Sequence, residues 1–451
     1  MTAHKASPQE RLQQAMRASD AEAIRACVSQ LHPVDLAEVC RDEMPYAALA
    51  LLSFLGAAAR AATFTELPPE RQRRLTELMT EEELGDLLES LAPGARADLF
   101  KQVEAGRRQG LLRYLTAEEQ RELERLASYP EGTAGALMTP QFVAVPETAT
   151  VQEVLEVLQQ HSDEAETIYQ VYALDESGQL VGTISLRKLI LARPSAPLAG
   201  YLTRDVLTVE VAAPQEGVAE MISRYDLLAL PVVEADGRLV GIVTYDDAMT
   251  VAEEEATEDM HKGMSIARLE GSVRTARPFE LYRKRVGWLV LLVFANIFAG
   301  AGIAHFEATI EAYIALVFFL PLLVDSSGNA GAQAATLMIR GMATGEVRRS
   351  DWARLLGREV AVALALGLTM ALCILGIGTL RAGPEIASVV AISMVLVVLM
   401  GSLIGMLLPL GLERLGLDPA TASAPLVTSL ADIVGVVLYF ALATAMLGLP
   451  A

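Results

Sequence analysis

The sequence has little of several residue types, and each shortage excludes a class of protein. Its 451 residues include only three cysteines, Cys27, Cys40 and Cys373, too few and too scattered for a disulfide framework or a cysteine-held metal cluster. The five histidines are also dispersed, and the sequence shows no glycine-rich phosphate loop with its lysine. The opening stretch MTAHKASPQERLQQ has no apolar core, so we expect no signal peptide and a soluble part in the reducing cytosol.

Basic residues are also scarce, because 36 Lys and Arg face 56 Asp and Glu. The imbalance is uneven: residues 1–285 carry a net charge of −17, and residues 286–451 carry −3. A strongly acidic soluble half argues against nucleic acid as a partner and in favour of cations or basic partners.

Residues 1–128 contain no run typical of a β-strand and are rich in Ala, Leu, Glu and Arg, which favour helices. A period of twelve residues runs through the second half of this region, and its repeats start at Leu67, Met79, Leu91, Val103 and Leu115. Two repeats carry a capping box, Thr80 with Glu83 and Thr116 with Glu119, which marks a helix start. We therefore predict an all-α superhelical N domain that serves regulation or protein binding rather than catalysis.

Residues 129–250 change to β-branched runs and contain an internal duplication. The segments SGQLVGTISLRKLI (177–190) and DGRLVGIVTYDDAM (236–249) match at an offset of 59 residues. An amphipathic helix is expected upstream of each, near residues 151–160 and 216–225. This duplicated βαβ unit resembles the cystathionine-β-synthase (CBS) domain pair, so we predict an α/β tandem CBS pair. The resemblance implies a sensor of small ligands, with ATP as a candidate.

Residues 251–285 form an acidic connector and juxtamembrane segment. A helix that starts just before it places Asp247, Glu255 and Glu258 near one another. Clustered carboxylates repel, and a hard divalent cation relieves the repulsion, although a solvated helix face is an alternative interpretation of the same spacing. Basic residues follow where the chain reaches the membrane: Arg274, Arg277, Arg283, Lys284 and Arg285.

Residues 286–451 contain five apolar runs, most of them as long as the ~20 residues that a membrane-spanning helix needs. The runs cover about residues 286–304, 312–339, 360–380, 386–412 and 424–449. The loop between the second and third runs holds Arg340, Arg348, Arg349, Arg354 and Arg358. Arginines mark cytoplasmic loops, so we predict a plasma-membrane protein with a cytoplasmic N-terminus and an outside C-terminus. Glu307 and Glu311 would then lie at the outer mouth, either concentrating cations or serving as ordinary surface acids.

Asp432 lies inside the fifth apolar run. An ionised Asp in hydrocarbon costs at least ~2.5 kcal/mol, so it should face protein or water and have a function there. At helical spacing Thr428, Asp432, Gly435 and Tyr439 share one face. We predict a cation path with Asp432 on its wall.

The second run contains another acid, Asp325, and is expected to be interrupted at Pro321, which has no N–H to donate. Asp325, Asn329 and Gln333 recur every four residues and so form a polar helix face. Together with Asp432, this face predicts functional use rather than packing alone.

The order of these parts, with the motifs PLLVDSSGNAGAQAAT (321–336) and ASAPLVTSLADIVG (422–435), resembles the MgtE family of magnesium transporters over nearly the whole chain. The resemblance implies a magnesium-selective, channel-like transporter, not an enzyme, that imports Mg²⁺ down its electrochemical gradient. It also implies a homodimer in the lipid bilayer, with hydrated Mg²⁺ held in a pore on the two-fold axis between the two Asp432 side chains.

The resemblance further implies that cytosolic Mg²⁺ bound at the CBS pair and connector holds the pore shut. The matching positions in this chain are Glu216, Ser223, Asp226, Asp247, Glu255, Glu258 and Asp259. Where described members carry acids, this chain has Ala62, Gly94, Pro214 and Thr250. These departures predict a weaker latch between the N domain and the CBS pair.

Other functions stay open at this point. Ala332 and Ala424 stand where some members carry Asn, which leaves preference over Co²⁺ or Mn²⁺ undecided. A CBS-regulated transporter of an anion or osmolyte would call for basic residues inside the spans, which instead carry Asp325 and Asp432. A membrane-anchored nucleotide sensor without transport would leave Asp432 without a purpose.

Overall fold

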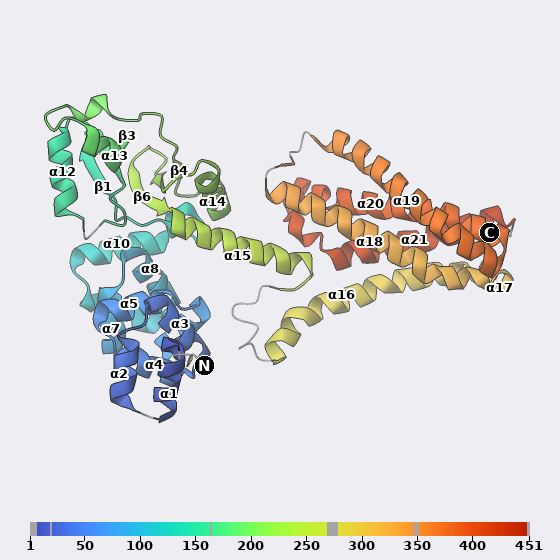
Figure 1. The fold of residues 1–451 in the computed structure, drawn as a ribbon, viewed down its shortest axis with the longest axis horizontal. Helices are drawn as coiled ribbons and strands as arrows, with labels where there is room; N and C mark the ends of the chain where they lie inside the picture. Colours follow the sequence, from blue (N-terminus) through green and yellow to red (C-terminus); the bar gives the residue numbers. More distant parts are fainter. Residues whose placement is uncertain are drawn as a thin grey trace, which may run out of the picture. The chain divides into compact units, whose positions relative to one another are not determined.

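The computed structural model describes residues 7–18, 20–162, 165–267, 278–344, 346–347 and 351–448 (Figure 1). The chain divides into two compact units, Met1–Glu255 and Ala256–Ala451. Four basic residues used above, Arg274, Arg277, Arg348 and Arg349, lie outside the described residues.

The N domain is helical throughout its described residues, as predicted. Its elements are α1 (Pro8–Ala18), α2 (Ala21–Val28), α3 (Pro33–Asp42), α4 (Pro45–Ser53), α5 (Ala57–Thr65), α6 (Pro69–Leu78), α7 (Glu81–Ser90), α8 (Pro93–Gln102), α9 (Ala105–Leu111), η1 (Leu112–Tyr114) and α10 (Ala117–Ser128). Each predicted repeat forms one short helix, and the residues at which repeats start are buried between helices. Both capping boxes are present, on α7 and α10. Arg107 donates to the carbonyls of Thr76 and Met79, which the end of α6 would otherwise leave unsatisfied.

The CBS pair contains two three-stranded sheets, each with one parallel and one antiparallel pairing. The first copy has β1 (Val143–Pro146), α12 (Val151–Gln160), β2 (Gln170–Leu174), β3 (Leu180–Ser185) and α13 (Leu186–Leu191), and it lies between α11 (Ala134–Leu137) and η2 (Leu198–Gly200). The second copy has β4 (Val209–Glu210), α14 (Gln215–Arg224), β5 (Ala229–Val233) and β6 (Leu239–Thr244). Helix α15 (Tyr245–Gly263) follows β6 directly and carries the acidic run as one helix.

The predicted strands of the duplicated segments are β3 and β6, and the two predicted helices are α12 and α14. The sequence interpretation missed the central strands β2 and β5, so each copy is βαββ rather than βαβ. All five residues of β5 are buried, and so are the three central residues of β2. Strands buried on both faces lack the alternation that reveals a strand in sequence.

Among its described residues, the second unit contains five helices that are long and apolar enough to cross a membrane. They are α16 (Pro278–His305), α18 (Ala315–Ala343), α19 (Trp352–Ala382), α20 (Pro384–Arg414) and α21 (Ala424–Met446), joined in part by α17 (Glu307–Ala312) and η4 (Pro419–Thr421). The predicted interruption of the second span was wrong, because α18 continues through Pro321. A proline in the second helical turn removes one hydrogen bond, and packing against α20 keeps the helix intact.

Glycines bring α18 and α20 into backbone contact. A Cβ on Gly401 would overlap the carbonyl oxygen of Ser327, and a Cβ on Gly405 would overlap that of Gly331. The Ser327 hydroxyl also donates to the Val397 carbonyl across 2.9 Å. Small residues at such crossings allow the close approach on which helix association in membranes depends.

Gly405→Ala should destabilise the membrane unit by about 1–3 kcal/mol, the usual effect of overpacking. Its melting temperature in detergent, measured by thermal unfolding, should fall by several degrees. Gly411→Ala is the matched control on the same helix, because a Cβ at Gly411 meets nothing within 4 Å. Equal melting temperatures for the two variants would contradict the close crossing.

Candidate cation path and regulatory acidic sites

The polar face of α18 lies in the middle of a membrane-spanning helix. The Asn329 Nδ2 atom donates to the Asp325 Oδ2 atom across 3.0 Å, one helical turn away. Both side chains are exposed in the single chain, and so is Gln333. Because a carboxylate at this depth must meet protein or water, another chain or an aqueous path must cover this face.

Asp432 on α21 lies next to this face. A Cβ added to Gly328 of α18 would come within 2.7 Å of the Thr428 Cγ2 atom and 3.3 Å of the Asp432 Oδ1 atom. Asp432 is half-buried, and its Oδ1 atom has no hydrogen-bond partner among the described residues. The Asp325 carboxylate is within electrostatic range of it. The structure therefore gathers Asp325, Asn329, Thr428 and Asp432 where α18 meets α21.

The rest of the predicted α21 face is buried within the helix bundle. Tyr439 is fully buried in the apolar core, and its hydroxyl donates to the Leu316 carbonyl across 3.0 Å. Gly435 is also buried, with Ser327 nearby. Helices α18 and α20 therefore cover the part of this face that carries Gly435 and Tyr439, whereas the part with Thr428 and Asp432 adjoins Gly328 of α18.

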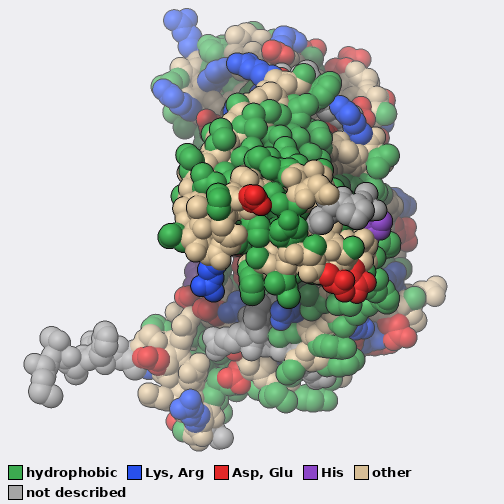
Figure 2. Space-filling view, turned by 90° about the vertical axis from the view of Figure 1, so that its right-hand side faces the viewer, with side chains coloured by type: hydrophobic (Ala, Val, Ile, Leu, Met, Phe, Trp, Pro, Cys, Tyr) green, Lys and Arg blue, Asp and Glu red, His purple; other side chains and the backbone are tan. Residues whose placement is uncertain are grey.

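The predicted outer-mouth acids, Glu307 and Glu311, lie on α17 and are exposed. Thr309 between them is buried, and its hydroxyl shares a 2.7 Å hydrogen bond with that of Thr444. Figure 2 shows a face of the molecule on which hydrophobic side chains predominate and acidic ones are few. A role for Glu307 and Glu311 in attracting cations stays a prediction.

Acidic side chains from three parts of the N-terminal unit meet around Asp247, near the start of α15. Burial raises the pKa of Asp247 to about 6; a 2.9 Å hydrogen bond from the Thr244 hydroxyl opposes the shift, and the carboxylates of Asp246, Glu166 and Asp98 add to it. Asp98 comes from α8 of the N domain, and Glu166 comes from the first CBS copy. The neighbouring side chains that add to this shift are all carboxylates, so the local charge around Asp247 favours a cation.

Asp247→Asn should raise the melting temperature of the metal-free protein by a few degrees near pH 7.5 and leave it unchanged near pH 4. The pKa of Asp247 is higher in the folded state than in the unfolded state. Its contribution to the free energy of unfolding is therefore fully present below the unfolded pKa of 3.8, and it is lost as the pH rises through about 6 and the folded carboxyl group ionises. Thermal unfolding in EDTA across this range measures the effect. Asp205→Asn, at an exposed acid, is the control; parallel pH profiles for wild type and Asp247→Asn would refute the prediction.

The other predicted regulatory residues of this unit lie along α14 and α15. Glu216 lies in the first turn of α14, Ser223 in its last turn and Asp226 just beyond it, and all three are exposed. Glu255 on α15 accepts a 2.8 Å hydrogen bond from the Gln215 Nε2 atom of α14. Helices α14 and α15 therefore lie in contact, and both carry side-chain oxygens that could serve as metal ligands.

Glu258 and Asp259 lie in the second unit, where the end of α15 meets the loop before α21. The Lys262 Nζ atom lies 2.7 Å from the Glu258 Oε1 atom and 2.6 Å from the Asp418 Oδ2 atom. Partial burial works to lower the pKa of Lys262, but the hydrogen bonds to Asp418 and Glu258 outweigh it and raise that pKa. The sequence interpretation missed Lys262 and Asp418, because one lysine after an acidic run looks like ordinary surface.

The described acids do not form a finished metal site. Within the described ranges, no group of three or more His, Cys, Asp or Glu side chains is arranged to hold a metal ion. The four positions without acids are at the N-domain and CBS surfaces: Ala62 on α5, Gly94 on α8, Pro214 before α14 and Thr250 on α15. Asp98 is the N-domain acid that helps to raise the pKa of Asp247, and nothing in the sequence indicated that these two residues influence each other.

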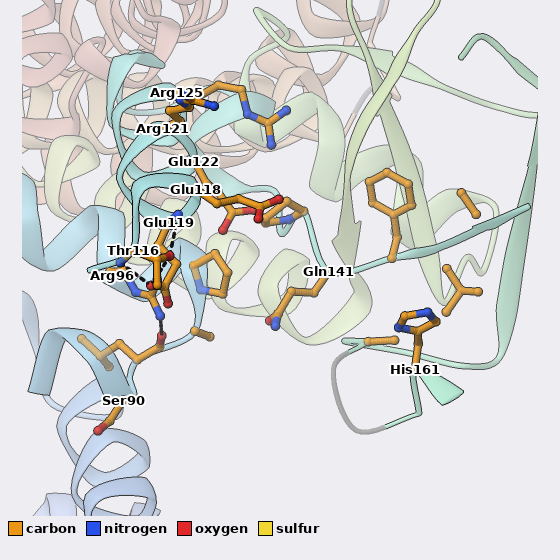
Figure 3. Close-up of a pocket in the computed structure, with 18 of the residues that line it drawn as sticks. Ser90, Arg96, Thr116, Glu118, Glu119, Arg121, Glu122, Arg125, Gln141 and His161 are labelled. Atoms are coloured by element: carbon orange, nitrogen blue, oxygen red, sulfur yellow. Dashed lines mark hydrogen bonds and ion pairs between the residues drawn. The ribbon is translucent and has the colours of Figure 1, made fainter. Parts of the chain in front are cut away.

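A cleft of about 1220 Å³ lies between the N domain and the first CBS copy (Figure 3). On one side the buried Arg96 pairs with Glu119 across 3.1 Å, and Gln141 and His161 lie on the other side. Acids and bases are interspersed along α10 in its lining. The cleft therefore lacks the single sign of charge that would select a divalent cation.

A helical cytosolic domain, a CBS pair and a bundle of five apolar helices with carboxylates inside it define a CBS-containing cation transporter of the membrane. Family models agree with this class along the chain. The model described as a divalent cation transporter matches residues 320–442, the MgtE intracellular N domain matches residues 31–132, and CBS domains match residues 134–195 and 198–254.

The chain belongs to the MgtE family. It is 38% identical over 445 residues to the magnesium transporter MgtE of Thermus thermophilus, which covers 97% of this chain and 98% of that protein. It is 35% identical over 334 residues to the magnesium transporter MgtE of Bacillus subtilis, covering 74% of each chain. The predicted family and its non-enzymatic class are confirmed.

Two crystal structures resemble the N-terminal unit. The cytosolic domain of the Mg²⁺ channel MgtE in complex with ATP is 37% identical, with a TM-score of 0.52 over 54% of this chain and 99% of that chain. The soluble part of a magnesium transporter is 31% identical, with a TM-score of 0.50 over 55% of this chain and 98% of that chain. The predicted helical N domain and α/β CBS pair are thereby confirmed.

Proposed function

We propose that this chain is a magnesium-selective, channel-like transporter. The observation that supports the proposal is the exposed Asp325–Asn329 pair beside Asp432, inside helices that cross the membrane. Carboxylate and amide oxygens attract cations and repel anions, so an anion or osmolyte path fits these side chains poorly. The magnesium transporters among its relatives favour Mg²⁺ as the ion carried.

A homodimer explains why this polar face is exposed in a single chain. A two-fold axis along the membrane normal would cover Asp325 and Asn329 and bring two Asp432 carboxylates to the same path. Mg²⁺ gives up its water reluctantly and is usually held by one or two carboxylates. With a cytoplasmic N-terminus and an outside C-terminus, the inside-negative potential drives influx with about 2.3 kcal/mol per charge per 100 mV.

Closure depends on acids of the N-terminal unit and the connector. The acids that would hold cytosolic Mg²⁺ are Glu216, Asp226, Asp247, Glu255, Glu258 and Asp259, together with Asp98, and Ser223 would add a backbone ligand. Without a cation their carboxylates repel one another and favour separation of α8, α14 and α15. The switch works only if these residues hold Mg²⁺ more tightly in the closed state than in the open one.

The CBS pair is the proposed site for ATP. The support is its resemblance to a cytosolic domain solved in complex with ATP. ATP would act there as a regulator, because downhill movement of Mg²⁺ needs no hydrolysis.

Flux measurements on purified protein in liposomes test the transport proposal. Mg²⁺ uptake reported by an internal dye should depend on the protein and on Asp432. A flux of Mn²⁺ or Co²⁺ that exceeds the Mg²⁺ flux would favour another divalent ion as the cargo. ATP binding without any ion flux would favour a membrane-anchored nucleotide sensor.

A further inference from the structure

Close contacts with α20 fix the rotation of α19. A Cβ on Gly367 would lie 2.8 Å from the Val395 Cα atom, and a Cβ on Gly378 would lie 3.1 Å from the Ala387 Cβ atom. The buried residues of α19 all lie on this face: Ala363, Gly367, Ala371, Ile374 and Gly378. Helix α19 packs chiefly on α20, so its opposite face points outward from the bundle.

The outward face of α19 changes character along the helix. It begins with Arg354 and Arg358, one helical turn apart and both exposed. The face continues at helical spacing with small and apolar side chains, also exposed: Ala361, Val362, Ala365, Thr369 and Leu372. Leu372 is 73% exposed, so no part of the described chain covers it.

The two guanidinium groups form an unneutralised pair. Like charges four residues apart on a helix destabilise it slightly unless an anion lies between them. Neither Arg354 nor Arg358 makes an ion pair with any residue in the described ranges. Glu359, the next residue, projects about 100° further around the helix and away from this face. An anion bound between Arg354 and Arg358 would therefore relieve the repulsion at the start of the outward face.

The helix length places this charge at the membrane surface. Helix α19 has 31 residues and is about 46 Å long, which exceeds the ~30 Å hydrocarbon layer. A span of about 20 residues counted back from Leu380, which is 93% exposed, ends near Ala361. Arg354 and Arg358 then lie just beyond the hydrocarbon, at the depth of lipid phosphates.

We propose that the outward face of α19 binds an anionic phospholipid of the cytoplasmic leaflet. Its phosphate lies between Arg354 and Arg358, and an acyl chain runs along Val362 and Leu372. A second copy of the chain is a poor occupant, because two-fold packing of parallel α19 helices would set four guanidinium groups against one another. The site does not depend on Mg²⁺ transport or on the pore.

Fluorescence quenching by brominated lipid tests the site. The chain has two tryptophans, Trp288 and Trp352, and replacing both with Phe leaves the tryptophan introduced by Ala361→Trp as the sole reporter on this face. In mixed bilayers of phosphatidylglycerol and phosphatidylcholine, we expect brominated phosphatidylglycerol to quench this reporter more strongly. The association constant of phosphatidylglycerol should exceed that of phosphatidylcholine by about fivefold or more, roughly the contribution of one basic side chain at an anionic surface.

Arg354→Gln combined with Arg358→Gln should abolish this preference, whereas Arg381→Gln, at the far end of the same helix, should leave it intact. High salt should also reduce it, because the contact is electrostatic. Equal quenching by the two brominated lipids in the reporter protein that keeps Arg354 and Arg358 would overturn the proposal. So would a preference that survives loss of both arginines, or one that falls as much with Arg381→Gln.

Discussion

Asp432→Ala should reduce Mg²⁺ flux into liposomes by at least about a hundredfold, because losing even ~2.7 kcal/mol of stabilisation slows a step that much. The variant removes the half-buried carboxylate that adjoins the polar face of α18. Its Oδ1 atom makes no hydrogen bond within the described part of the chain, so the side chain contributes little to holding the fold. We therefore expect the melting temperature to stay near that of wild type while transport is lost.

Two variants separate the loss of charge from other effects. Asp432→Asn keeps the shape of the side chain, so a flux as low as that of the alanine variant would assign the effect to the charge. Glu385→Ala removes an acid from the first turn of α20, outside the path, and should transport at the wild-type rate. Wild-type flux through Asp432→Ala would sink the proposed path.

Neutralising the regulatory acids should have the second large effect. In the full chain, Asp247→Asn combined with Glu255→Gln and Glu258→Gln should raise the cytosolic Mg²⁺ concentration for half-inhibition by about tenfold or more, equivalent to ~1.4 kcal/mol of coupling. Conductance measured against cytosolic Mg²⁺ gives this value. A matched triple at exposed CBS acids, Glu156→Gln with Glu176→Gln and Asp205→Asn, should leave it unchanged. An unchanged inhibition curve for the first triple would refute the regulatory assignment.

Conductance measured against cytosolic Mg²⁺ also determines how much the N domain contributes to inhibition. The absence of acids at Ala62 and Gly94 predicts a weak latch, yet Asp98 of this domain acts on Asp247. Removing residues 1–128 should therefore weaken inhibition less than the triple neutralisation does. A loss of inhibition that equals or exceeds that of the triple would reject the weak latch.

Periodicity and duplication made most of the fold predictable. The twelve-residue period yields one helix per repeat, and the offset of 59 residues relates β3 to β6. Apolar runs located the five helices of the described chain that are long and apolar enough to cross a membrane. The strands β2 and β5 escaped prediction because burial on both faces removes the alternation on which strand prediction depends.

The candidate site was predictable wherever its residues share one helix. Asp325 with Asn329, and Thr428 with Asp432, follow from helical spacing combined with the high energy of polar groups in hydrocarbon. Spacing does not reveal which part of a face a neighbouring helix covers, and Tyr439, on the same face as Asp432, is fully buried. The electrostatic influence of Asp98 on Asp247 and the ion pair of Lys262 with Asp418 join distant segments, and only the folded chain brings them together.

The glycine crossing of α18 and α20 limits how the path can open. Gly401 and Gly405 lie against the α18 backbone, so a rotation that turned a larger side chain of α20 into the crossing would clash. The two helices therefore form a rigid frame that carries Asp325 and Asn329. In the proposed channel, gating movements would then belong to the elements around this frame, chiefly α21 with its Asp432 and the end of α15, where Lys262 pairs with Glu258 and Asp418.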